Sequence, residues 1–210
     1  MLTNVVVSTL IVCIPSTVVS IIIGVPIGYI LKIKRFKGRK FVLRLVYTLS
    51  GLPPVLAGLL VYIMLSKKGP FGFLDILFTK WAMIIAQVIL IVPIVVLYTL
   101  SSLKNVQIVL DNLDFLNVKG KKRYIVLIKE YSKELVYATI LGLSRSISEV
   151  GAVLIVGGNI EGETRILTTA IIYEITKGEF SRALLLGMVL LIISFAFNTI
   201  LQVLQGDIVD

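Results

Sequence analysis

The sequence contains no histidine and only one cysteine, Cys13, among its 210 residues. One cysteine cannot form a disulfide within the chain, and without histidine or further cysteines the usual thiolate and imidazole metal sites are not expected. The missing histidine also excludes Ser-His nucleophilic catalysis. No glycine-rich phosphate loop of the GxxxxGK type occurs, so an ATP-driven activity requires a second chain that binds the nucleotide.

Charged residues are scarce as well. They make up 16% of the chain, against 57% hydrophobic residues and a mean hydropathy of +1.00, which is far too apolar for a soluble globular protein. The first apolar run leads into the basic segment KIKRFKGRK rather than a cleavage site, so it is a retained span. We predict an all-α membrane protein with a single transmembrane domain. Its five apolar runs are long enough to cross about 30 Å of hydrocarbon, and the predicted spans are 5–31, 41–65, 81–103, 134–158 and 183–205.

The net charge of +9 is concentrated in alternate loops. Segments 32–44 and 104–133 each hold seven lysine or arginine residues, whereas the segment after the fourth predicted span holds four glutamates against three basic residues. Basic loops of membrane proteins lie on the cytoplasmic side. We therefore predict that both basic segments and the C-terminus are cytoplasmic and that the N-terminus is outside. This charge pattern argues against nucleic-acid binding.

Two ionisable residues, Arg145 and Glu149, interrupt the fourth apolar run. A charge at the bilayer centre costs roughly 2.5–3.5 kcal/mol, so such residues usually face a bundle interior or a water-filled path. At about 100° per residue they share a polar face of one continuous helix with Ser144 and Ser148, and their spacing of four allows an ion pair. Two hypotheses follow: a structural pair in a helix-packing seam, or a substrate path formed by these four residues.

Glycines and prolines predict where the helices end or approach one another. Gly157, Gly158 and the following asparagine should end the helix that carries Glu149. Segment 166–177 contains a helix too short to cross the membrane, which we place at the outer surface. Gly24 and Gly28 have the GxxxG spacing, which permits close helix packing.

Four sequence blocks resemble the permease subunits of tungstate and molybdate ABC importers. They read GLPPVLAGLLVY at 51–62, RSISEVGA at 145–152, GGNI at 157–160 and TRILTTAI at 164–171. Over nearly its whole length the chain is thus similar to the binding-protein-dependent transport inner membrane component family. The residues that carry the later blocks are Gly151, Gly157, Gly158, Asn159, Thr164, Arg165, Thr168 and Thr169.

This resemblance implies the type I, molybdate-permease-like fold and the import of an oxyanion, tungstate or molybdate, across the cell membrane of a prokaryote. It implies a homodimer that binds two cytoplasmic ABC ATPase subunits and an extracytoplasmic oxyanion-binding protein. ATP and Mg would be used by the ATPase, so we expect this chain to bind no cofactor and to be no enzyme. Sulfate or phosphate transport is an alternative, and an intramembrane enzyme that relies on Glu149 alone is a remote one.

Side-chain chemistry suggests roles for the four residues of the fourth run. Arg145 would attract the oxyanion, Ser144 and Ser148 would donate hydrogen bonds to it, and Glu149 would hold Arg145 in place. These roles follow from the chemistry of the side chains, whereas the resemblance supports only their positions.

The resemblance also places a short coupling helix for the ATPase within segment 104–133. The family pattern there is E-A-A, three residues and G, followed by nine residues and I-x-L-P. The chain departs from this pattern at the triplet and at the glycine, and it lacks the L-P ending. An amphipathic basic segment on anionic lipid is the alternative. The residues we expect to contact the ATPase are Asp111, Asn112, Leu113, Leu116 and Asn117.

Overall fold

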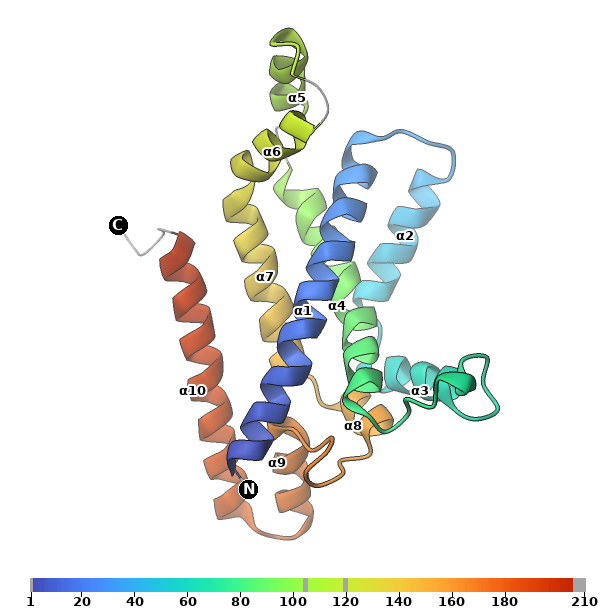
Figure 1. Ribbon diagram of the computed structural model, residues 1–210, viewed down its shortest axis with the longest axis vertical. Coiled ribbons are helices and arrows are strands. Elements are labelled where there is room, and N and C mark those ends of the chain that lie inside the picture. The colour runs from blue at the N-terminus through green and yellow to red at the C-terminus, as the bar shows by residue number, and fades with distance from the viewer. Residues whose placement is uncertain (1, 104–105, 119–120, 206–210) are drawn as a thin grey trace.

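The structure is a computed structural model that describes residues 2–103, 106–118 and 121–205. Within these ranges the chain is helical, with no strand, so the predicted all-α class is confirmed. Figure 1 shows the helices as an elongated bundle with the shorter helices at its two ends. The helices are α1 (Leu2–Ile33), α2 (Arg39–Ser50), α3 (Pro54–Leu65), η1 (Gly72–Leu74), α4 (Lys80–Ser102), α5 (Val106–Phe115), α6 (Lys121–Glu130), α7 (Ser132–Ile147), α8 (Gly151–Gly157), α9 (Leu167–Thr176) and α10 (Phe180–Gln205).

Three helices, α1, α4 and α10, are each long and apolar enough to cross a membrane. The predicted spans 5–31, 81–103 and 183–205 fall on these three helices. Helix α1 continues through Pro15 and Pro26, and α4 through Pro93. Together with the broken spans, these helices define a multi-pass membrane protein with up to five spans in the described part of the chain.

The other two predicted spans are bent pairs of helices, and the expectation of one continuous helix in the fourth span was wrong. Segment 41–65 divides into α2 and α3, which meet at 105°, and segment 134–158 divides into α7 and α8, which meet at 59°. The first break has a local cause. Pro53 and Pro54 lack backbone N–H groups, and Pro54 opens α3 at a position where that absence costs nothing. In Figure 1, α2 runs along the bundle and α3 runs across it.

Glycines set the closest contacts between helices. A Cβ atom added to Gly24 would lie 2.7 Å from the Val95 side chain, and one added to Gly28 would lie 2.7 Å from the Thr99 side chain. The GxxxG spacing therefore packs α1 directly against α4 within the chain, as predicted. The main buried cluster lies beside this contact, between α1, α3, α4 and α8.

The two ends of the bundle differ in charge. The basic α1–α2 connection and helices α5 and α6 lie at one end, whereas α9 and the starts of α1 and α10 lie at the other (Figure 1). The fold thus brings both basic segments to the same end, as the positive-inside pattern requires.

Candidate functional site

The candidate site lies at the break between α7 and α8, which separates Arg145 from the helix that follows it. Helix α7 ends at Ile147 and α8 begins at Gly151, so Glu149 lies between two helices rather than in the middle of one. The prediction of a continuous helix here was wrong. No proline marks this break, and the interactions that stabilise it come from the side chain and the carbonyl group of Glu149.

Glu149 joins three helices at the break. Its carboxylate is 2% exposed, and its Oε1 accepts a hydrogen bond of 3.0 Å from the backbone N–H of Ala152 in the first turn of α8. This contact satisfies one of the N–H groups that a helix leaves free at its start. Its Oε2 lies 3.3 Å from Arg145 Nη2, and its backbone carbonyl accepts a hydrogen bond of 2.9 Å from Thr168 Oγ1 in α9. The expected Arg145–Glu149 ion pair is therefore present.

The remaining candidate residues do not all share one surface. The Arg145 side chain is 31% exposed, and the exposed Ser148 donates a hydrogen bond from Oγ to the Arg145 carbonyl. Ser144 instead donates to Asn198 Oδ1 of α10 at 3.1 Å. The structure therefore brings Arg145, Ser148 and Glu149 together at the break and directs Ser144 toward the last helix.

The glycines of the two family blocks bring α3 against α8. A Cβ atom on Gly58 would lie 2.7 Å from the Ala152 Cα, and one on Gly151 would lie 2.9 Å from the Val55 side chain. The blocks at 51–62 and 145–152, far apart in the sequence, are therefore neighbours in the structure. At the other end of α8, Gly157 packs against Met83.

The predicted helix end after Gly157 is confirmed. Helix α8 ends there, and Gly158 and Asn159 adopt left-handed conformations with φ of 69° and 51°. A glycine is suited to such a position because it has no Cβ to clash with the backbone. In the loop that follows, Thr164 Oγ1 donates to the Gly157 carbonyl and accepts from the Ile160 N–H.

The remaining family-block residues fix α9. Arg165 is buried, with its Nη1 3.1 Å from Glu161 Oε2 and its guanidinium 4.2 Å from the centre of the Tyr173 ring. Thr169 Oγ1 accepts from the Ile166 N–H just before α9 starts. The short helix is present as predicted. Its first turn is buried against the rest of the chain, and the Leu167 N–H donates to Thr9 Oγ1 of α1.

A buried polar cluster beside the break was not predicted. Gln87 of α4 accepts hydrogen bonds at Oε1 from Ser16 of α1 (2.6 Å) and Ser146 of α7 (2.7 Å), and its Nε2 donates to the Ser146 carbonyl (3.1 Å). All three side chains are buried. The available signal was Gln87 itself, the one amide side chain in the largely apolar span 81–103. We call these three residues the amide cluster.

The predicted coupling segment forms α5 and α6, apart from residues 104–105 and 119–120, which lie outside the described residues. Asp111, Asn112 and Leu116 are exposed, whereas Leu113 is buried in a cluster against which Tyr29 and Ile33 of α1 also pack. Asn117, at the family's glycine position, has a φ of 52°. The N–H groups of residues 117 and 118 donate to the carbonyls of residues 114 and 113, the pattern of a Schellman C-cap, in which asparagine is the usual substitute for glycine.

These features define a class of protein: a multi-pass helical membrane protein in which a buried carboxylate, paired with a partly exposed arginine, lies at a break in one span. Among the described residues, no group of three or more cysteine, aspartate or glutamate side chains is placed to hold a metal ion.

Comparison with known proteins specifies the family. The chain is 39% identical to the tungstate uptake system permease protein TupB of Peptoclostridium acidaminophilum, over 91% of this chain and 85% of the relative. It is 36% identical to TupB of Campylobacter jejuni (81% and 72%) and 37% identical to the probable anion ABC transporter permease protein of Haloferax volcanii (85% and 79%). A sulfate transport system permease protein of Synechococcus elongatus is 25% identical. No family model matches the chain. The chain belongs to the ABC transporter permease family that includes these tungstate and anion permeases.

Proposed function

We propose that this chain is the permease subunit of an ATP-driven importer that moves tungstate across the cell membrane. The observation that carries this proposal is the 36–39% identity to two tungstate uptake permeases over more than four fifths of the chain. Molybdate is a second candidate because it is an oxyanion of the same charge and similar shape. Sulfate is a third, favoured by the more distant similarity to a sulfate permease.

Arg145 is the residue we propose to meet the anion. Its guanidinium has five N–H donors, and Glu149 neutralises it from the buried side while 31% of the side chain stays exposed. The exposed Ser148 hydroxyl lies one turn further along and would add a hydrogen bond to the anion once its donation to the Arg145 carbonyl opens. Ser144 would reach the anion only after its hydrogen bond to Asn198 opens, so its contribution belongs to another conformation of the bundle.

The break at residues 148–150 is the hinge we propose for gating. Hinges are short segments whose backbone angles change while the flanking helices stay rigid. Glu149 connects α7, α8 and α9 through Arg145, Ala152 and Thr168. A rotation of α8 relative to α7 would therefore move Arg145 together with the oxyanion bound to it.

The partners follow from the same proposal. Two copies of this chain would form the path, two cytoplasmic ABC ATPase subunits would bind and hydrolyse ATP with Mg, and an extracytoplasmic binding protein would deliver the anion. The ATPase would dock at α5, where Asp111, Asn112 and Leu116 are exposed next to the 91% exposed Phe115. In this arrangement the N-terminus is outside and the C-terminus is cytoplasmic.

The structure disfavours an intramembrane enzyme that relies on Glu149. A general acid or base must reach its substrate or a water molecule. The Glu149 carboxylate is 2% exposed, with one oxygen bound to the Ala152 N–H and the other facing Arg145. These contacts suit a structural carboxylate.

The decisive experiment is transport in proteoliposomes that contain this chain with its ATPase and binding protein. We expect ATP-dependent uptake of radiolabelled tungstate that a tenfold excess of unlabelled tungstate or molybdate reduces strongly and a hundredfold excess of sulfate does not. Stronger competition by sulfate would assign the chain to sulfate transport instead. ATP-independent uptake would contradict the importer proposal.

A further inference from the structure

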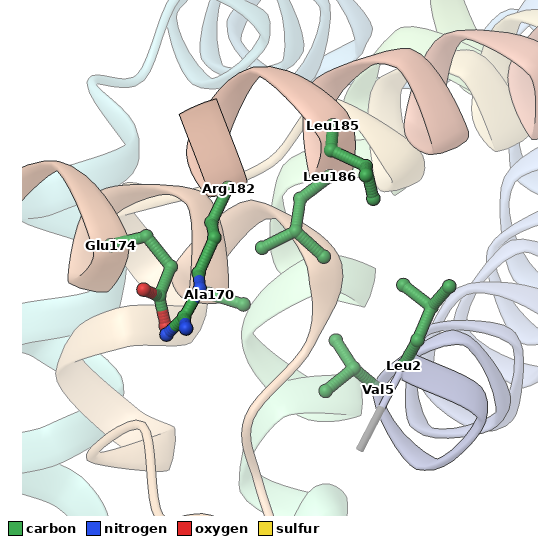
Figure 2. Close-up of a pocket in the computed structure, with 7 residues that line it drawn as sticks. All are labelled: Leu2, Val5, Ala170, Glu174, Arg182, Leu185 and Leu186. Atoms are coloured by element: carbon green, nitrogen blue, oxygen red, sulfur yellow. The ribbon is translucent and has the colours of Figure 1, made fainter. Parts of the chain in front are cut away.

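A cavity of about 340 Å³ opens between α1, α9 and α10 at the end of the bundle opposite the basic segments. Figure 2 shows its two kinds of lining. One part is apolar, and the other holds the side chains of Glu174 in α9 and Arg182 in α10, which extend toward the same end of the cavity. The apolar part is formed by Leu2, Val5, Leu185 and Leu186.

Glu174 is the unusual residue of this cavity. It is 3% exposed, and its Oε2 atom accepts no hydrogen bond. Burial of a carboxylate oxygen without a donor is costly, so such a group normally has a partner. Arg182, whose side chain extends toward the same end of the cavity as Glu174 (Figure 2), is exposed, which leaves its N–H donors accessible to a ligand.

The position of the cavity restricts what can fill it. Helix α10 begins here, just after α9 ends at Thr176, so the cavity lies near the end of this span, where the headgroups of a bilayer would be. The neighbouring outer face of α10 carries the exposed apolar side chains of Leu184, Met188 and Leu191. A molecule in the cavity therefore has a polar end beside Glu174 and Arg182 and an apolar end that continues along α10 into the lipid.

We propose that this cavity binds a phospholipid with a primary amine headgroup, phosphatidylethanolamine. The lipid ammonium donates hydrogen bonds to Glu174 Oε2, the phosphate accepts from Arg182, and an acyl chain lies along Leu185 and Leu186. Phosphatidylglycerol offers hydroxyl donors but no positive charge, and phosphatidylcholine offers a positive charge but no N–H. Of these three lipids, only the amine lipid supplies both a positive charge and an N–H donor to a buried carboxylate.

The test uses the full-length chain, purified in detergent, stripped of lipid and incubated with each of the three lipids. Native mass spectrometry counts bound lipid, and thermal unfolding measures the stabilisation that specific binding produces. We expect the wild-type chain to retain phosphatidylethanolamine at least fivefold better than phosphatidylglycerol or phosphatidylcholine. Glu174→Gln should abolish this preference, and the matched control Glu179→Gln, at an exposed glutamate five residues away, should keep it.

Two further variants separate the effect of the Glu174 charge from the effects of the apolar lining and of Arg182. Leu185→Trp should fill the apolar part and reduce retention of all three lipids, and Arg182→Gln should weaken all three because each has a phosphate. Because Glu174→Gln removes a buried charge, it should fold at least as well as the wild type without lipid.

Equal retention of the three lipids by the wild type, or an unchanged preference in Glu174→Gln, would overturn the proposal. So would a change in oligomeric state without a change in lipid retention, because the cavity would then be an interface between copies of the chain.

Discussion

At the residue scale, Arg145 and Glu149 are unequal partners. Glu149 is buried and has structural hydrogen-bonding partners in two other helices, whereas Arg145 is partly exposed and its only described side-chain partner is Glu149. Removing one partner of a fully buried pair costs about 3–5 kcal/mol. The cost here should be smaller for Arg145 replacements, because solvent screens a group that is 31% exposed. The contacts of Glu149 are those of a structural residue, and the substrate-path hypothesis for Arg145 stays a prediction.

The first prediction separates charge from packing at Arg145. We expect Arg145→Gln to assemble with the ATPase but to lose at least tenfold in tungstate uptake, because the neutral amide attracts the dianion weakly. Arg145→Lys keeps the charge and should retain more uptake than Arg145→Gln. Uptake normalised to assembled complex is the measurement, and wild-type uptake by Arg145→Gln would return the pair to a purely structural role.

The amide cluster gives a second prediction at this scale. Gln87→Leu removes the acceptor of the Ser16 and Ser146 hydroxyls and the donor to the Ser146 carbonyl. Both serine hydroxyls keep backbone carbonyl acceptors, so the cost is that of the lost hydrogen bonds, about 0.5–1.5 kcal/mol each, and thermal unfolding of the purified chain should begin at a lower temperature. The control is Gln202→Leu, at an exposed glutamine of α10. Equal stability of the two variants would show that the cluster contributes nothing.

At the scale of elements, the contact of α3 with α8 determines the shape of the site. Gly58 lies so close to Ala152 that an added Cβ would meet backbone atoms, which cannot rotate away as a flexible side chain can. Helix α3 follows one break and α8 follows the other, so the contact between these two helices stabilises both broken spans.

The third prediction tests this contact. Gly58→Val should destabilise the chain by about 1–3 kcal/mol, the usual cost of overpacking, and should reduce uptake because α8 moves away from α3. Gly187→Ala in α10 is the matched control, since nothing lies within 4 Å of a Cβ atom there. Thermal unfolding and uptake are measured for both. An effect of Gly187→Ala as large as that of Gly58→Val would rule out the close approach as the cause.

A fourth prediction concerns α5. A cysteine at Asn112, introduced after Cys13 is replaced, should crosslink to the ATPase in the assembled complex. Asn112 is exposed, and its segment keeps a glycine-like C-cap at Asn117 although its sequence departs from the family pattern. A cysteine at Lys67, in the connection after α3, should not. If Asn112→Cys never crosslinks while the complex remains intact, α5 is not the docking helix.

At the scale of the whole molecule, orientation follows from charge. The fold places the α1–α2 connection and helices α5 and α6 at one end and the start of α1 at the other. These basic segments should face the cytoplasm because moving many positive charges across the membrane is unfavourable during insertion.

The fifth prediction tests orientation with single cysteines in a chain without Cys13. Cysteines at Lys37 and Lys68 are suitable because both side chains are exposed, whereas a side chain at the nearby Gly69 would meet the Ile63 carbonyl. In intact cells, an impermeant reagent should label Lys68→Cys and spare Lys37→Cys. Both should react after the membrane is opened, which controls for accessibility. The reverse pattern would invert the topology.

Much of the fold could be predicted because lipid imposes simple rules. Long apolar runs must be helical to satisfy their backbone hydrogen bonds, so the spans at α1, α4 and α10 could be read directly. The GxxxG contact and the helix end at Gly157 also depend on local chemistry. The bend at Pro53 and Pro54 had a local signal, but a proline in a membrane helix is compatible with anything from a slight kink to a right-angle turn.

The sequence by itself determined the class of protein, the ends of its continuous spans and the presence of a costly charge pair, because hydrophobicity, helix-ending residues and spacing act over a few residues. Only the tertiary structure decided that Glu149 lies in a break, that Ser144 faces α10 and that Gln87 meets two serines. Each of these depends on contacts between helices far apart in the chain. Such contacts are set by packing, and local periodicity carries no information about them.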